Sequence, residues 1–284
     1  MRISLTTTAA LAAGTALVLA LTSCGTDSDP GSGTGAADGS GALTVAASPV
    51  PHAEILEYVR DHLAEDAGLD LDVKVFNDYV LPNTATESGE VDANFFQHQP
   101  YLDDFNDKNG TRLTPVAEVH LEPLGLYSAS LEDAGDIPRG GTVAVPSDTT
   151  NEGRALKLLA DRGVIELADG VGANGTLDDI ADRKGLEFEE LEAATVPRAL
   201  DEVDAAVING NYAIEADLEP ADDALAIEGA EDNPYANLLA VKEGHEQDPD
   251  VRTLARLLTS EEVSAFIEDE YDGSVVPASG TTAP

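Results

Sequence analysis

The chain has 284 residues, of which 55 are acidic and 15 are basic, so its formal net charge at pH 7 is −40. Such a surface repels nucleic acid and anionic lipid head groups, which excludes a protein that binds nucleic acid through a basic face. The chain contains a single cysteine, Cys24, which excludes an intramolecular disulfide. Core packing must therefore supply the stability.

The N-terminus has the pattern of a secretory signal. Arg2 precedes an apolar run over residues 3–21 that contains no acidic residue, and Leu-Thr-Ser follows directly before Cys24. This ending resembles a bacterial lipobox, in which the Cys thiol receives a diacylglycerol and becomes the first residue of the exported protein. We therefore predict a lipoprotein signal peptide over residues 1–24 that ends at lipidated Cys24. The alternative is a structural Cys in an uncleaved helix.

A flexible tether is predicted over residues 25–41, where Gly, Ser, Thr, Ala and Asp dominate and no large apolar residue occurs. Such a segment cannot bury apolar surface. Lipid, tether and globular body together predict a protein that is anchored to the cell membrane and exposed on its extracytoplasmic face. The lipid supplies roughly 0.8 kcal/mol of anchoring per buried methylene.

Strands and helices alternate in the rest of the chain, and an extended segment over residues 119–128 separates two such sets. The strands of the first set are predicted over residues 43–47, 71–76 and 91–96. Its helices are predicted over residues 51–63, 84–89 and 101–109. Later strands are predicted over residues 141–146, 186–188, 204–208 and 237–241. Later helices are predicted over residues 151–161, 197–203, 250–258 and 260–271.

This alternation indicates an α/β protein with open, mostly parallel sheets. We expect two open α/β lobes joined by a hinge that the chain crosses twice. Lobe one is predicted to comprise residues 42–125 and 238–284, and lobe two residues 126–237. The alternative is one continuous doubly wound domain.

Ligands of open α/β sheets bind beyond the carboxyl ends of the strands, where loops meet helix N-termini. In this chain those positions carry polar and aromatic side chains. Lobe one contributes His52, Tyr79, Phe96, His98 and His120. Lobe two contributes Arg154, Asn209 and Asn211. The two sets face each other if the lobes close on a cleft.

The segment over residues 94–101 places three of the chain's 13 Phe and Tyr residues among Asn, Gln and His. Aromatic walls with a few polar groups suit a pocket for a small, partly apolar ligand, whereas a buried strand is the alternative. Strand alternation puts Asn94, Phe96 and His98 on one side, and Phe95 and Gln97 on the other. We therefore expect Phe96 and His98 to contact the ligand and Phe95 to lie in the core.

Arg154 is expected in the first turn of a helix, where the helix dipole already favours an anion. Its guanidinium can bind a carboxylate through two parallel hydrogen bonds. The alternative is a surface ion pair. Asn209 and Asn211 follow a buried strand and can bind a carboxylate and an ammonium, although they can equally form a turn.

No catalytic motif competes with binding: the chain lacks a glycine-rich phosphate loop, a cysteine nucleophile beyond Cys24 and a serine elbow motif. We expect no enzyme activity and no cofactor. A zinc site in which His52, His98 and His120 converge with Glu118 or Glu122 is the main alternative, although no tight metal motif supports it. A surface adhesin or purely structural lipoprotein is a third class.

Several motifs together resemble the methionine-binding lipoproteins of ABC importers, over about residues 43–276. They are Val-Pro-His-Ala-Glu-Ile-Leu at residues 50–56, the segment over residues 94–101, Val-His-Leu-Glu-Pro-Leu-Gly-Leu-Tyr-Ser at residues 119–128, Asn-Glu-Gly-Arg-Ala-Leu at residues 151–156, residues 205–212, and Pro-Tyr-Ala-Asn at residues 234–237.

The resemblance implies a two-lobed fold like that of the periplasmic binding proteins, which closes over methionine (L, D or both) and passes it to a membrane permease driven by an ATPase. It implies that Arg154 binds the ligand carboxylate, and that Asn209, Asn211 and Asn237 fix its carboxylate and amino group. Tyr79, Phe96, His98 and His120 would surround the thioether, with no metal. Another small apolar amino acid or a dipeptide remains an alternative ligand.

Overall fold

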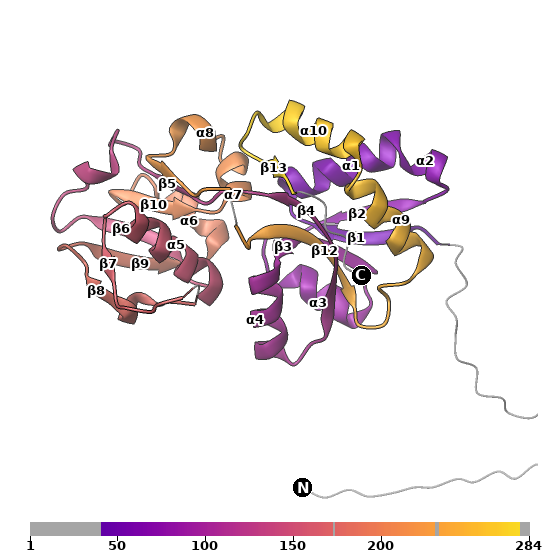
Figure 1. The fold of residues 1–284 in the computed structure, drawn as a ribbon, viewed down its shortest axis with the longest axis horizontal. Coiled ribbons are helices and arrows are strands. Elements are labelled where there is room, and N and C mark those ends of the chain that lie inside the picture. Colours follow the sequence, from indigo (N-terminus) through magenta and orange to yellow (C-terminus); the bar gives the residue numbers. More distant parts are fainter. Residues whose placement is uncertain (1–40, 173, 231–232, 279–284) are drawn as a thin grey trace, which may run out of the picture. The chain divides into compact units, whose positions relative to one another are not determined.

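The computed structural model describes residues 41–172, 174–230 and 233–278, and Figure 1 shows its fold. The predicted signal peptide, the lipidation at Cys24 and nearly all of the predicted tether lie outside the described residues. Within the described ranges, no helix has the length and apolar character needed to cross a bilayer.

Six strands form the first sheet, in the order β13-β4-β12-β3-β1-β2. Their bounds are β1 Leu43–Ala47, β2 Leu71–Val75, β3 Ala93–His98, β4 Leu113–Leu121, β12 Ala236–Lys242 and β13 Val276–Pro277. β1 pairs in parallel with β2 and β3. β12 runs antiparallel to β3 and β4, and β13 runs antiparallel to β4. The sheet is therefore mixed.

The direction of β12 shows that the prediction of a mostly parallel sheet is wrong. β12 begins beside the carboxyl end of β3, where Asn237 pairs with His98. A parallel strand at this place would need a crossover connection to bring the chain to the other end of the sheet. The chain instead arrives directly from the second sheet, so β12 runs back along β3.

Helices cover both faces of the first sheet (Figure 1). On one face, Leu239 and Val241 pack with apolar residues of α1, α9 and α10. On the other face, Leu238 and Ala240 pack with Leu102 of α4, because successive strand residues point to opposite sides. The helix bounds are α1 Glu54–His62, α2 Ala64–Ala67, α3 Leu81–Ser88, α4 Gln99–Asn109, α9 Pro249–Leu258 and α10 Glu261–Tyr271.

Five strands form the second sheet, in the order β11-β5-β10-β6-β9. Their bounds are β5 Gly125–Tyr127, β6 Thr142–Pro146, β9 Glu187–Leu191, β10 Ala205–Ile208 and β11 Ala226–Ile227. β6 pairs in parallel with β9 and β10, whereas β5 runs antiparallel to β10 and β11. β7 Glu166–Leu167 and β8 Ile180–Asp182 form a separate antiparallel pair.

The second sheet also carries helices on both faces. α5 Thr149–Asp161 covers one face, and its Leu156 and Leu159 pack against Val143, Val145 and Val207. α6 Val196–Ala199 and α7 Gly210–Glu215 cover the other face, beside Ala144, Ala206 and Ile208. α8 Pro220–Asp223 follows α7. Two α/β lobes, each built on its own sheet, agree with the predicted fold class.

The chain passes from the first sheet to the second through residues 122–124 and returns through residues 228–235, of which 231 and 232 are not described. β5 begins at Gly125 and β12 at Ala236, so the sheets change within two residues of the proposed lobe boundaries. β4 was expected only as an extended segment from residue 119, yet it begins at Leu113. Pro115 hides this strand in the sequence, and it is tolerated because the pairing with β12 shifts register there.

His52 and His120 are buried against Phe95 in the core of lobe one, with exposed fractions of 1% and 0%. Their ring centroids lie 4.8 Å apart, and they lie 4.8 Å and 5.3 Å from the centroid of Phe95. Burial lowers the pKa of His52 to about 4 and that of His120 to about 3. Both imidazoles are therefore neutral in the folded protein at physiological pH.

These two histidines should make the folded state less stable as the pH falls from 7 to 5. The unfolded chain takes up protons below the ordinary histidine pKa of 6.5, and the folded chain does not, so unfolding becomes easier in acid. Each group contributes up to about 1.4 kcal/mol per pH unit in this window. Glu122, whose pKa burial raises, acts in the opposite direction and reduces the net slope.

Urea denaturation at several pH values measures this slope. His120→Phe, which keeps a ring in the core, should take up about one proton fewer on unfolding near pH 5. The matched change in the exposed His62 of α1, His62→Phe, serves as the control. Equal slopes for wild type and His120→Phe would contradict the assignment.

Candidate functional site

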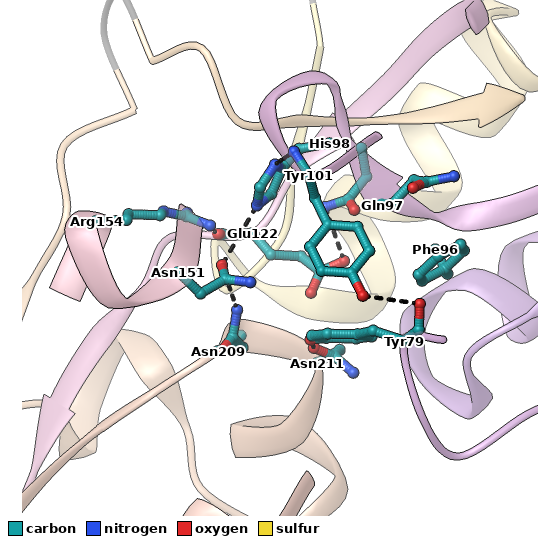
Figure 2. A pocket seen from close by; sticks show the side chains of 12 residues that line it. Tyr79, Phe96, Gln97, His98, Tyr101, Glu122, Asn151, Arg154, Asn209 and Asn211 are labelled. Atoms are coloured by element: carbon teal, nitrogen blue, oxygen red, sulfur yellow. Dashed lines mark hydrogen bonds between the residues drawn. The ribbon is translucent and has the colours of Figure 1, made fainter. Parts of the chain in front are cut away.

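A pocket lies where side chains of the two lobes meet (Figure 2). Its ring-bearing residues are Tyr79, Phe96, His98 and Tyr101. The other residues from lobe one are Gln97, Glu122 and Asn237. Lobe two contributes Asn151, Arg154, Asn209, Gly210 and Asn211.

Seven of the eight predicted ligand-binding residues line this one pocket, namely Tyr79, Phe96, His98, Arg154, Asn209, Asn211 and Asn237. The eighth, His120, does not line it. It is fully buried behind Glu122, with Nε2 2.7 Å from Glu122 Oε1. Direct contact of His120 with a ligand is therefore not supported, because the Glu122 side chain lies in between.

His98 connects the two lobes. Its Nδ1 accepts a hydrogen bond from the backbone N–H of Tyr101 at 3.2 Å, so it caps the N-terminus of α4. Because Nδ1 is an acceptor, the proton of the neutral ring is on Nε2, which lies 3.3 Å from Asn151 Oδ1 in lobe two. Burial, and then the nearby Arg154, lower the pKa of His98 to about 3.

The expected alternation along β3 is broken at Phe96. Leu238 of β12 pairs with Gln97 and Leu239 with Phe95, which leaves Phe96 in a bulge. Gln97 therefore returns to the side of Asn94, and its Nε2 donates to Asn94 Oδ1 at 2.8 Å. The prediction that Gln97 shares a side with Phe95 is wrong, whereas Phe95 does lie in the core.

Arg154 lies in the second turn of α5, not in the first as predicted, because the helix begins at Thr149. Its side chain is 4% exposed. Nε lies 3.0 Å from both carboxylate oxygens of Glu228, and Nη2 donates to the backbone oxygen of Glu122 at 2.8 Å. The guanidinium carbon is 4.3 Å from the centroid of Tyr235. Among the described residues, none accepts a hydrogen bond from Nη1.

Three asparagines provide the remaining polar groups. Asn209 Nδ2 donates to Asn151 Oδ1 at 2.9 Å, and Asn211 Oδ1 accepts a hydrogen bond from the Tyr79 hydroxyl. Asn209 Oδ1 and Asn211 Nδ2 are buried and have no partner among the residues that the structure describes. Asn237 Nδ2 lies 3.2 Å from Glu122 Oε1. Unpaired buried amides at a pocket wall are available to a ligand.

Four side chains of the pocket were not predicted: Gln97, Tyr101, Glu122 and Asn151. All four lie inside motifs that are described above (residues 94–101, 119–128 and 151–156), so proximity to a predicted contact was the signal that could have found them. Glu122 is the most informative of the four, because it is a carboxylate that is only 5% exposed.

The alternative zinc site of His52, His98 and His120 is not formed. The compact group of possible ligand atoms, all within 4.8 Å of one another, consists of His52, His120 and Glu122. His98 is instead engaged in capping α4 and in contact with Asn151.

Comparison with known proteins gives consistent matches over the globular body. Residues 43–279 match the family model described as NlpA lipoprotein. The methionine-binding lipoprotein MetQ of Bacillus subtilis is 39% identical over 254 residues, which cover 88% of this chain and 92% of that protein.

Two solved structures are similar in fold as well as in sequence. One is a nutrient-binding protein from Burkholderia cenocepacia bound to methionine, with 43% identity, a TM-score of 0.80, and coverage of 83% of this chain and 99% of that one. The other is a periplasmic substrate-binding protein of an ABC transporter from Coxiella burnetii, with 37% identity, a TM-score of 0.80, and coverage of 83% and 100%. The chain therefore belongs to the NlpA lipoprotein family.

Proposed function

We propose that this protein captures methionine outside the cell and delivers it to an ABC importer composed of a permease and an ATPase. The observation that carries the proposal is a buried pocket in which an arginine and unpaired amides lie beside an aromatic wall. The protein binds its ligand and leaves it chemically unchanged.

The polar end of the pocket suits the main-chain groups of an amino acid. Arg154 Nη1 and the unpaired Nδ2 of Asn211 are donors for a carboxylate. The unpaired Oδ1 of Asn209 and the side chain of Asn237 are available to the amino group. A buried polar group without a partner costs about 1–3 kcal/mol, so a ligand that pairs with these amides removes that cost.

The apolar end suits a thioether. Tyr79 lies 5.9 Å from Phe96 and 5.8 Å from Tyr101 between ring centroids, so the three rings form one wall. Sulfur against an aromatic ring contributes about 0.3–1.5 kcal/mol per contact, and three rings provide several such contacts. His98 adds a neutral imidazole to this wall, whereas His120 acts from behind it.

The names of the relatives support the same ligand and the same transport role. The Bacillus subtilis relative is named as methionine-binding, and the Burkholderia cenocepacia structure contains methionine. The Coxiella burnetii structure is named as the substrate-binding protein of an ABC transporter.

Closure of the lobes would enclose the ligand and form the surface that the permease recognises. Contacts between the lobes that support closure include Tyr79 with Asn211 and His98 with Asn151. A diacylglycerol on Cys24 would hold the body at the extracytoplasmic face of the membrane, with residues 25–41 as the tether.

Isothermal titration calorimetry with protein that lacks residues 1–24 tests the ligand. We expect heat of binding and a thermal shift with L-methionine, D-methionine or both. Absence of both signals for both stereoisomers would refute the proposal. Tighter binding of leucine or of a methionine-containing dipeptide would favour the alternative ligands.

Arg154→Ala should weaken methionine binding at least about a hundredfold, because a desolvated carboxylate loses its charged partner. Arg154→Lys keeps the charge opposite Glu228 and should still lose most of the affinity, because an ammonium cannot reproduce the planar fork of donors. Arg112→Ala is the control, since Arg112 is 80% exposed and pairs with Glu243 at the surface. Wild-type affinity in Arg154→Lys would exclude the assigned role.

The lipid anchor is tested in cells. Cys24→Ser removes the thiol that would carry the lipid, so metabolic labelling with a radioactive fatty acid should be lost. The variant should also leave the detergent phase in Triton X-114 partitioning, while the wild type stays in it. Labelling that persists in Cys24→Ser would contradict lipidation at this residue.

A further inference from the structure

Glu122 is a buried carboxylate at the wall of the pocket, in the first crossing between the lobes. Three groups converge on its Oε1: His120 Nε2 at 2.7 Å, His52 Nε2 at 3.2 Å and Asn237 Nδ2 at 3.2 Å. Asn237 belongs to β12 and His120 to β4, whereas His52 lies in the turn Pro49–Ala53 before α1. His120 and Asn237 form hydrogen bonds with this oxygen, whereas His52 Nε2 lies beside it without forming one.

None of these three groups supplies a positive charge. The two imidazoles are desolvated and neutral, and the asparagine is an amide. Arg154 contacts the backbone oxygen of Glu122, but its charge is paired with the carboxylate of Glu228. Among the described residues, no lysine or arginine forms an ion pair with the Glu122 carboxylate, and the two histidines beside it are neutral.

An ionised carboxylate that is buried without a cation is costly, and a cation supplied by a ligand removes that cost. The ammonium group of an amino acid is such a cation. In an amino acid the ammonium and the carboxylate are attached to the same carbon. The protein group that accepts a hydrogen bond from the ammonium therefore has to lie close to the group that donates one to the carboxylate. Glu122 meets this requirement because its own backbone oxygen is bonded to Arg154.

We propose that Glu122 accepts the ammonium group of the ligand, and that His52 and His120 are positioning residues that hold its carboxylate toward the pocket. The inference rests on the proposed function and specifies how the amino group is recognised. It limits the ligands to molecules with a free amino group beside a carboxylate, or with the amino terminus of a short peptide at the same place.

Lobe two restricts Glu122 from the opposite side. A Cβ atom on Gly210, the first residue of α7, would lie 2.7 Å from Glu122 Cβ, so only glycine fits there without a shift. Burial raises the pKa of the Glu122 carboxyl, and polar neighbours that include the backbone N–H of the next residue, Asn211, only partly offset this rise. Glu122 is thus held between the two lobes, where its orientation depends on both.

The wild-type protein provides the first test. Methionine is compared with 2-hydroxy-4-(methylthio)butanoate, in which a hydroxyl group replaces the ammonium and the rest of the molecule is retained. We expect the hydroxy acid to bind at least about a hundredfold more weakly, because loss of one partner of a buried charge pair costs several kcal/mol. Equal affinities would overturn the inference.

Glu122→Gln should weaken methionine binding and bring the two affinities to within about threefold of each other, since the amide has no charge to discriminate them. Glu118→Gln removes a carboxylate from the adjoining strand β4, outside the pocket, and is the matched control. A wild-type ratio in Glu122→Gln would overturn the inference. Thermal unfolding curves establish whether each variant is folded. The comparison of methionine with the hydroxy acid on the wild-type protein does not depend on any variant.

The histidines are tested through the same ratio. His120→Gln can place an amide donor near the position of the imidazole Nε2, whereas His120→Phe preserves only the ring. We expect His120→Gln to keep most of the preference for methionine over the hydroxy acid. In His120→Phe the ratio of the two affinities should fall at least about tenfold. A purely structural role predicts the reverse, because Phe fills the core better than Gln does.

These outcomes separate the two proposals. A wild-type protein that binds neither methionine nor its hydroxy analogue would overturn the proposed function. Tight methionine binding with an unchanged ratio in Glu122→Gln would overturn only the role of Glu122. Stabilisation of the protein by zinc, lost in His120→Phe, would instead indicate that the three groups hold a metal and would also overturn it.

Discussion

The ion pair between Arg154 and Glu228 is the interaction on which the arrangement of the pocket depends. A guanidinium that is 4% exposed has to be paired, and Glu228 provides the counter-charge from the segment that leads back to lobe one. Arg154 also bonds the backbone of Glu122 in the other crossing segment. One side chain of lobe two thus contacts both crossings, while its remaining edge faces the pocket.

The pocket also separates charge. The guanidinium of Arg154 is paired with the carboxylate of Glu228. The carboxylate of Glu122 instead has only neutral side chains, those of His52, His120 and Asn237, beside its Oε1. Both charges are desolvated, so each interacts more strongly with a ligand than it would in water. A zwitterion matches this separation, and the aromatic wall beside it accepts an apolar side chain.

Many features of the fold could be predicted because they are local. The predicted helices of lobe one end or begin at capping residues, such as Gly110 with a φ of 66° after α4 and Ser260 before α10. The strands β1, β2, β6, β10 and β12 begin and end within one residue of their predicted bounds, whereas the short strand β11 was not predicted. β4 was recognised only in part, because Pro115 interrupts its pattern, and the direction of β12 depends on where the chain re-enters the sheet.

The sequence by itself determined which side chains reach the ends of the strands, since the alternation of strands and helices places loops there, and seven of these residues line one pocket. Tertiary structure alone decided the rest. The bulge at Phe96 arises from the pairing of β3 with β12, which is distant in the chain, and it turns Gln97 toward Asn94. His120 lies behind Glu122 because the two side chains and His52 meet in the core, and such contacts between distant segments leave no local pattern in the sequence.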